Sequence, residues 1–332
     1  TSPENDRFAQ VITNRLWKRY MGHGLVEPVD DWDGAQPSHP DLLKWLGHQL
    51  AMNGYDLKAL ASLIFNSHAY QRQTVGSAAQ ITAPSKRLFA GPARRSMTAE
   101  QLVDSMFVAA AKPMKSEPLN MDIDGRRPID TFLNLGRPMR AWEFASLSNE
   151  RDRPALSMPM AQNISDVLKT FGWRETRQDP ITVRDQTPTV LQPLAVANSV
   201  VGHRVVTLSD DHALTAVAVR DVRLDQIIEQ SFKRFLSRKP SDDEVAIFAS
   251  LLSDGFDKRI VKPTASSRRS EKRHAVSWSN HLNAEATKIM LEMEQRAREG
   301  DPPTERLDSD WRKRMEDMLW ALVNSPEFVF VP

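Results

Sequence analysis

The sequence predicts an all-α, multi-helical protein made of two related helical units joined by a proline-rich irregular crossover. Apolar residues recur at three- and four-residue spacing through most of the chain, whereas alternating, strand-like runs are few. A series of short motifs occurs twice in the same order, which indicates a helical unit used twice. We therefore expect a first unit at residues 1–111, the crossover at 112–160 and a second unit at 161–332.

The repeated motifs lie more than two hundred residues apart. They read Trp17-Lys18-Arg19-Tyr20, Pro37-Ser38 and Asn66-Ser67 in the first half, and Phe232-Lys233-Arg234-Phe235, Pro240-Ser241 and Asn324-Ser325 in the second. Their order is the same but their intervals differ, which predicts that segments are inserted at different points of the two copies. In the second unit we expect such an inserted segment at about residues 254–310.

Helices of the first unit are expected where an apolar stripe follows a helix-start residue. The stripes are Phe8, Ile12, Leu16 and Tyr20; Leu57, Leu60, Ala61, Ile64 and Phe65; and Leu102, Val103, Met106, Phe107 and Ala110. The first stripe follows Ser2-Pro3-Glu4-Asn5, and the third follows the cap-like sequence that begins at Thr98. We expect these helices to pack into a core that is continuous with that of the second unit.

Helices of the second unit follow the same logic. Their stripes are Leu224, Ile227, Ile228, Phe232, Phe235 and Leu236; Val245, Phe248, Ala249 and Leu252; Leu282, Ala286, Ile289, Met290, Met293 and Ala297; and Trp311, Met315, Met318, Leu319 and Leu322. Ser241-Asp-Asp-Glu244 fits a capping box, and Pro326 cannot continue the last of these helices. The tail from Phe328 is expected to be an extended segment.

The composition limits the classes of function. With 44 basic and 43 acidic side chains the formal net charge is +1, so no nucleic-acid footprint is expected from the total. The absence of cysteine excludes thiolate zinc sites, iron–sulfur clusters and covalent haem attachment within this chain, and no cofactor is expected in it. No apolar run predicts a transmembrane segment. Because the chain starts without methionine, we expect it to be a piece of a longer product.

The richest polar segment is the acidic loop, residues 22–41. Its candidate catalytic residues are Asp30, Asp31 and His39, which could form an oxygen-rich metal site or an acid–base pair. No recognised ligand spacing is present, which favours a structural role for these side chains.

Two arginines are expected to hold the acidic loop. Arg15 and Arg19 lie one helical turn apart beside the first apolar stripe, so partly buried guanidinium groups would need carboxylate partners. Asp30 and Asp31 are the candidate partners, and the two arginines are candidate binding residues.

The crossover holds a dense charged patch. Its members Glu150 and Asp152 are weak catalytic candidates, and Arg151 and Arg153 are candidate binding residues. A charged network that braces the crossover is favoured over a catalytic centre, because the patch has no nucleophile-elbow glycines and no nearby histidine.

Two further patterns suggest ligands. Asn120, Asp122 and Asp124 resemble the first half of a calcium loop, but the twelfth position is Thr131 instead of a bidentate glutamate. The basic run at residues 268–273 could contact an anionic polymer, although such a run is more often a solvated loop.

Six of the eight tryptophans divide into two groups by pattern. Trp17, Trp45, Trp311 and Trp320 sit inside helical patterns and are expected in the core. Trp32 and Trp142 lie in polar loops and are the candidates for exposed stacking in a binding site.

A combination of motifs across essentially the whole chain resembles one family. The motifs are Asn14-Arg15-Leu16-Trp17, the run from Gly22 to Asp31, Ser38-His-Pro-Asp-Leu-Leu43, Gly54-Tyr-Asp-Leu-Lys58, Ser67-His-Ala-Tyr70, Arg95-Ser-Met-Thr-Ala-Glu-Gln-Leu102 and Leu319-Trp-Ala-Leu-Val-Asn-Ser-Pro-Glu-Phe328. This combination resembles the C-terminal domain of unknown function 1553, the PSD-one domain, of large proteins abundant in planctomycetes.

The resemblance implies export to the periplasm or cell envelope. Family members commonly carry a signal peptide, often a cytochrome-c-like domain, and a further domain ahead of this one, so haem is expected only in another domain of the precursor. A sulfatase- or phosphatase-like protein is often encoded nearby and is a plausible envelope partner. The segment after Gly136-Arg-Pro-Met-Arg140 lacks the cysteine of many relatives, so a thiol-dependent haem or metal role is not expected here.

The function predicted from these observations is a noncatalytic docking or assembly module of an exported envelope protein. Its main surfaces would be the acidic loop and residues 136–154. One alternative is an enzyme or redox accessory that acts on envelope or imported polysaccharide through Asp30, Asp31, His39, Glu150 and Asp152. The other alternative is an anionic-polymer binding module that uses residues 268–273.

Overall fold

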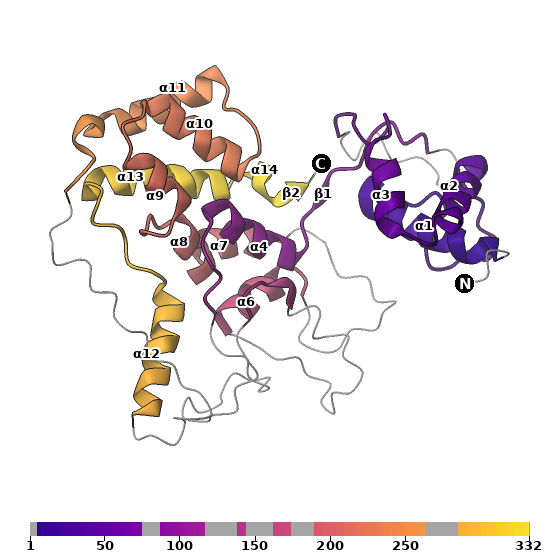
Figure 1. The fold of residues 1–332 in the computed structure, drawn as a ribbon, viewed down its shortest axis with the longest axis horizontal. Coiled ribbons are helices and arrows are strands. Elements are labelled where there is room, and N and C mark those ends of the chain that lie inside the picture. Colours follow the sequence, from indigo (N-terminus) through magenta and orange to yellow (C-terminus); the bar gives the residue numbers. More distant parts are fainter. Residues whose placement is uncertain are drawn as a thin grey trace. The chain divides into compact units, whose positions relative to one another are not determined.

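The structure is a computed structural model, and it describes residues 5–74, 87–116, 138–143, 162–173, 189–262 and 285–331. The predicted all-α class is confirmed, because the regular elements of these residues are helices apart from one short pair of strands. The chain divides into two compact units, Thr1–Ser96 with Phe330–Pro332, and Met97–Val329. The first unit therefore ends before residue 111, the end expected from the sequence. Figure 1 shows the elements of both units.

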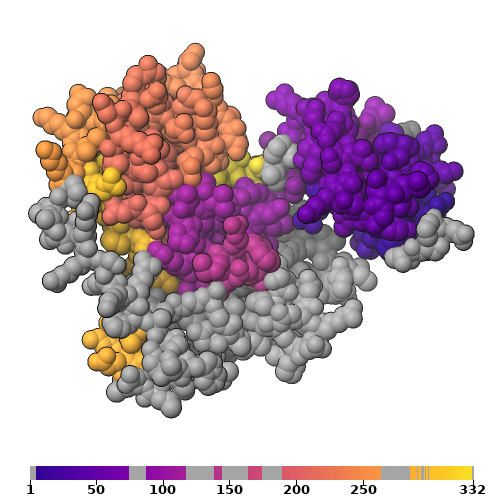
Figure 2. All heavy atoms as spheres, in the orientation of Figure 1, coloured from indigo at the N-terminus to yellow at the C-terminus, as the bar shows by residue number. Residues whose placement is uncertain are grey.

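In its described residues, the first unit holds three helices and both short strands. They are α1 (Asp6–Met21), α2 (Pro40–Met52), α3 (Leu57–Phe65), β1 (Arg95–Ser96) and β2 (Phe330–Val331). The three helices pack against one another around a core that includes Trp17, Met21 and Leu60. Figure 2, which draws all heavy atoms, shows the indigo and purple atoms of this unit gathered in one closely packed mass. The strands β1 and β2 are antiparallel, with Arg95 opposite Val331.

The other helices of the described residues belong to the second unit. They are α4 (Ala99–Ala110), α6 (Gln162–Thr170), α7 (Leu191–Asn198), α8 (Val200–Val206), α9 (Ala213–Ala218), α10 (Leu224–Phe235), α11 (Asp242–Ser253), η3 (Phe256–Lys258), α12 (Ala286–Glu299), α13 (Ser309–Val323) and α14 (Pro326–Val329). Their shared core includes Met106 of α4, Phe232 of α10 and Trp311 of α13, all buried. The described buried residues of each unit thus form a cluster of their own.

The repeated motifs occupy corresponding places in two sets of helices. The first motif lies at the end of α1 and of α10, and the second precedes α2 and α11. The third ends α3 and α13 in the same way. The side-chain amide of Asn66 donates to the Ser62 carbonyl (2.8 Å), and that of Asn324 donates to the Trp320 carbonyl (2.9 Å). The repeat therefore encodes the same helix stop twice.

Two helix starts confirm the capping predictions. Thr98 begins α4 and Ser241 begins α11, and each forms a capping box with the glutamine or glutamate three residues later. Glu244 of the second box also accepts hydrogen bonds from Arg238, which in turn donates to Glu327 of α14. One guanidinium group therefore joins the start of α11 to α14. The predicted extended tail is present only at Phe330–Val331, because Phe328 lies in α14.

Candidate functional site

A short turn, residues 138–143, holds two apolar side chains at the surface of the second unit. Met139 is 63% exposed and Trp142 is 51% exposed. The backbone of the turn is fixed from α4, where Asp104 accepts hydrogen bonds from the N–H groups of Ala141 (2.7 Å) and Trp142 (3.2 Å). The structure thus presents two apolar side chains on an anchored backbone.

Two further hydrogen bonds anchor this turn. The Ser116 hydroxyl donates to the Pro138 carbonyl (3.1 Å), and the Met139 N–H donates to the Glu143 carboxylate (3.0 Å). Burial raises the pKa of Asp104, and the hydrogen bonds from the turn oppose that shift without cancelling it. The half-buried carboxylate of Asp104 is therefore committed to the turn.

The acidic loop of the first unit is clamped to α1 by a buried side chain. Both polar atoms of the Asn14 side-chain amide form hydrogen bonds with the backbone of Val26. Nδ2 donates to the Val26 carbonyl (2.9 Å), and Oδ1 accepts from the Val26 N–H (3.0 Å). Asn14 is fully buried. Glu27 accepts a further bond from the Gly24 N–H (2.7 Å), which closes the turn between them. The buried polar groups at the start of the loop are therefore hydrogen-bonded, as polar groups in a protein core are.

The candidate catalytic residues of this loop do not converge. Asp30 accepts two hydrogen bonds from the Arg15 guanidinium group (3.0 and 2.7 Å), which is the ion pair expected from the sequence. Both partners are about half exposed, so Arg15 is less buried than predicted. Asp31 accepts from the Asp33 N–H, and Arg19 is exposed and makes no ion pair with a described residue. These carboxylates serve the loop's own geometry.

The imidazole of His39 is also engaged. Its Nδ1 lies 3.1 Å from the Ser38 hydroxyl, and its ring meets that of Phe89 edge to face. Trp32 donates from its indole N–H to the Val29 carbonyl (2.9 Å), and the Arg7 guanidinium lies over its ring. Trp32 is partly buried, whereas Trp142 is exposed.

The tryptophan predictions from helical pattern are half right. Trp17 and Trp311 are buried as expected, but Trp45 is 50% exposed and Trp320 is 46% exposed. In α2 the buried stripe is Leu43, Leu46 and Leu50, and Trp45 lies beside it. The expectation that these two tryptophans lie in the core is therefore wrong, and the phase of each stripe was the signal that could have corrected it.

A buried charged centre lies where α4 ends in the second unit. The Lys112 ammonium donates to the carbonyls of Arg204 (2.9 Å) and Thr207 (3.0 Å), and burial lowers the pKa of Lys112 to about 8. The Arg204 guanidinium donates to the Lys115 carbonyl (2.6 Å) and the Ala297 carbonyl (3.1 Å). Both cations therefore bind main-chain oxygens from several segments.

Two carboxylates offset the positive charge of this centre. The Lys115 ammonium lies 2.5 Å from Asp301 and 3.5 Å from Asp211. His212 is buried beside them, and burial lowers its pKa to about 3. Such shifts often mark catalytic groups, but here each shifted group already has structural partners. The centre joins four segments of the chain instead of facing a substrate.

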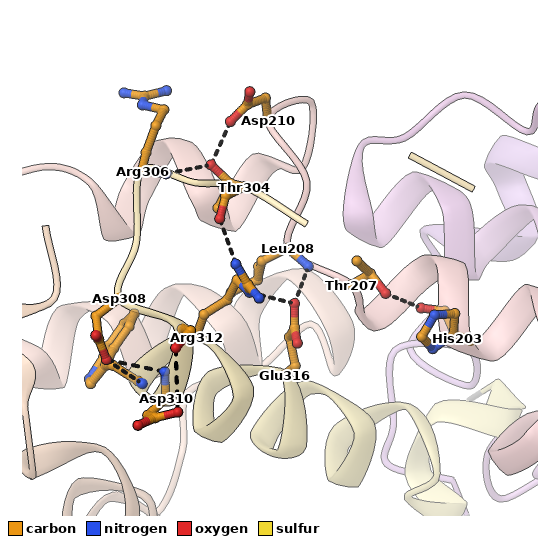
Figure 3. Close-up of polar contacts among 12 residues, drawn as sticks. His203, Thr207, Leu208, Asp210, Thr304, Arg306, Asp308, Asp310, Arg312 and Glu316 are labelled. Atoms are coloured by element: carbon orange, nitrogen blue, oxygen red, sulfur yellow. Dashed lines mark hydrogen bonds and ion pairs between the residues drawn. The ribbon is translucent and has the colours of Figure 1, made fainter. Parts of the chain in front are cut away.

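A second polar network ties α13 to the same region (Figure 3). Glu316 accepts from the Leu208 N–H (2.8 Å), and burial raises the pKa of Glu316. Arg312 donates to the Thr304 carbonyl (2.7 Å), and the Thr304 hydroxyl donates to Asp210. The members of this network are far apart in sequence, and so are those of the charged centre. Neither group was therefore predicted from the sequence.

Several predicted site residues lie outside the described residues. They are Asn120, Asp122, Asp124, Glu150, Arg151, Asp152 and Arg153, together with the basic run at 268–273. Among the residues that the structure does describe, no group of three or more histidine, aspartate or glutamate side chains is arranged to hold a metal ion. None of the described helices has the length and apolar character that a membrane span requires.

Comparison with known proteins gives one match. A family model for PSD1, a protein of unknown function (DUF1553), matches residues 1–252, which is more than half of the chain and reaches into α11. No curated protein and no solved structure matches the chain.

Proposed function

We propose that this chain, which belongs to the PSD1 family of proteins of unknown function (DUF1553), is a noncatalytic docking module of a protein exported to the cell envelope. The observation that supports docking best is the turn at residues 138–143, which holds Met139 and Trp142 outward on an anchored backbone. Family membership itself assigns no reaction.

The turn has the properties of a binding surface. Tryptophan and methionine are enriched at protein interfaces, and tryptophan is frequent among the residues that dominate binding energy. Asp104 and Ser116 hold the backbone in place before any partner arrives, so less conformational entropy is lost on binding. We infer that the partner contributes an apolar pocket that receives the Trp142 indole.

The described carboxylates support docking over catalysis. Asp30 is held by Arg15, and Asp31 accepts a main-chain N–H within its own loop. Carboxylates that act as acid and base would be expected to face a shared open cleft with their oxygen atoms free. In the acidic loop they fix the shape of the loop, which suits a surface that another protein recognises.

The proposed partner is another envelope protein. The resemblance to DUF1553 proteins makes a sulfatase- or phosphatase-like protein, or another domain of the same precursor, the first candidate. Export and envelope location belong to the same proposal and rest on that resemblance.

The test uses two matched pairs of exposed apolar residues in the second unit. The chain would be isolated from native envelope extract after mild cross-linking, in its wild-type form and as two double variants. The first variant, Met139→Ser with Trp142→Ser, removes the apolar groups of the turn. The control, Leu191→Ser with Leu194→Ser, removes two side chains of α7 that are 61% and 56% exposed.

The expected result is a stoichiometric partner that survives salt washing with the wild type and the α7 control but is lost with the turn variant. Recovery of the wild-type chain as an uncross-linked monomer would contradict the docking function. A partner retained by the turn variant and lost by the control would move the interface to α7.

A further inference from the structure

The first unit has a pocket that the docking function does not use. It lies between α1 and α2 and has a volume of about 320 Å³. Its lining residues are Asp6, Gln10, Asp41, Lys44, Trp45, Gly47 and His48. This volume is at the lower end of the range of about 300–1,000 Å³ that is usual for small-molecule sites.

The close approach of the two helices explains the pocket. Gly47 is buried at the crossing, and a Cβ atom there would lie 3.1 Å from Gln10 Cγ and 3.6 Å from the Ala9 carbonyl carbon. Because residue 47 has no side chain, the two helices meet closely there. Gly47 lines the pocket together with Trp45 and His48 of the same helix.

The polar side chains of this pocket have no hydrogen-bond or ion-pair partner among the described residues. Within the described residues, the side chains of Asp6, Gln10, Asp41, Lys44 and His48 make no ion pair or hydrogen bond with one another or with other groups. All of these except the half-buried Gln10 are exposed. In contrast, the charged groups of the acidic loop and of the buried centre are largely paired. The pocket thus offers free donors and acceptors around one half-exposed indole.

The geometry points to a binding site for a neutral sugar residue of a glycan chain. The apolar face of a pyranose ring packs well on an indole such as that of Trp45, because the ring C–H groups carry slight positive charge and the aromatic face is negative. The hydroxyl groups at the ring edge both donate and accept. Carboxylates at Asp6 and Asp41 would accept from them, while Lys44 would donate to them.

The charges in the pocket argue against other ligands. The lining carries two carboxylates and one ammonium group, so there is no excess of lysine or arginine charge for a sulfated or phosphorylated polymer. One aromatic ring does not form the cage that recognises quaternary ammonium groups. The pocket is partly open to solvent, which allows a longer glycan to continue beyond the bound residue.

The experiment uses the full chain and an immobilised panel of glycans covering neutral hexose, pentose, N-acetylhexosamine and sulfated oligosaccharides. Titration calorimetry then follows with the best-bound soluble oligosaccharide. The variants are Trp45→Ala and Asp41→Asn, and the matched control is Trp320→Ala, which removes a tryptophan of nearly equal exposure from the second unit. All four proteins would first be compared by circular dichroism, since the changed residues are exposed.

The expected result is binding to a neutral or N-acetylated glycan that changes little with salt concentration. Trp45→Ala should weaken it about tenfold or more, as expected for the loss of one aromatic contact, and Trp320→Ala should leave it unchanged. Absence of binding to every neutral glycan would overturn the inference. So would binding that is confined to sulfated glycans, or binding that Trp45→Ala does not weaken. Because the two sites lie in different units, failure here leaves the docking test unaffected.

Discussion

The carboxylate of Asp104, in the middle of α4, accepts a hydrogen bond from the backbone N–H of Trp142, thirty-eight residues further along the chain (3.2 Å). Helix-interior carboxylates are usually solvated, but this one is half-buried and serves as the anchor of a surface turn. The position of the exposed Trp142 is thus fixed in part by a carboxylate of α4.

Loss of this anchor should loosen the turn. Asp104→Ala removes the acceptor of two main-chain N–H groups, so we expect the second unit to lose about 1–3 kcal/mol of unfolding free energy. Hydrogen exchange at the amides of Ala141 and Trp142 should become faster than in the wild type. The control Asp317→Ala removes an exposed carboxylate of α13 and should leave both amides protected. Unchanged exchange in Asp104→Ala would show that the turn is held by other contacts.

The clamp at Asn14 should be specific for an amide. In Asn14→Ala the buried N–H and carbonyl of Val26 lose their partners, and we expect a loss of about 2–3 kcal/mol in the first unit. Asn14→Asp should be no better, because a carboxylate cannot donate to the Val26 carbonyl. The control Asn53→Ala removes an exposed helix-end amide and should cost less than about 1 kcal/mol. Urea denaturation, read by hydrogen exchange at Val26, distinguishes these outcomes.

Stability of the second unit should fall in mild acid because of His212. Its Nε2 lies 3.0 Å from the Val205 carbonyl, and its Nδ1 accepts from the Leu214 N–H at the start of α9. Only the neutral ring can make both bonds, and burial, assisted by Lys112, lowers the pKa of His212 to about 3. Between about pH 6.5 and 3 the unfolded chain binds the extra proton, so unfolding free energy falls as pH falls.

The steepest contribution of one such group is about 1.4 kcal/mol per pH unit. The comparison is between the wild type and His212→Asn, which can still cap α9 but does not titrate. The variant should be less stable at pH 7 and should show a weaker dependence on pH below 6.5. Equal slopes for the two proteins would mean that His212 is protonated in the folded state.

Stability should rise in mild alkali because of Lys112. Burial lowers the pKa of Lys112 from 10.5 to about 8, while Asp211 and Asp301 oppose the shift. Between pH 8 and 10.5 the unfolded chain therefore binds more protons, and unfolding free energy increases with pH. Lys112→Met should abolish this increase, and the exposed control Lys313→Met should retain it. Urea midpoints of the second unit at several pH values from 7 to 10 provide the measurement.

Local patterns predicted the helices α1, α3, α4, α10, α11, α12 and α13, whereas the short helices α6 to α9 were not predicted. The capping boxes at Thr98 and Ser241 and the stop at Asn324 are encoded within three or four residues, so they could be recognised without tertiary structure. The repeat also placed corresponding helices in the two halves. The grouping of buried faces into clusters could not be predicted this way, because periodicity identifies a buried face but not the helix that covers it.

The candidate sites show the same limit. The Arg15–Asp30 pair was predictable because both residues belong to one loop and the helix beside it. Asp104 and Lys112 were missed because their partners are main-chain groups far along the chain, which carry no side-chain signal. Trp45 was assigned to the core from its helix alone, and only its position beside the stripe of Leu43, Leu46 and Leu50 distinguishes it.

The strand β2 gives the first unit a piece of sequence from the far end of the chain. Phe330 pairs with Ser96, and the Arg94 guanidinium lies over the Phe330 ring. During synthesis, therefore, the helices α1 to α3 emerge long before the strand that completes their unit. A stop codon or a protease cut just before Phe330 would remove no core residue of the second unit. It would instead remove the strand that pairs with Arg95 and Ser96. Damage at the carboxyl end of this chain would thus affect the folding of the first unit.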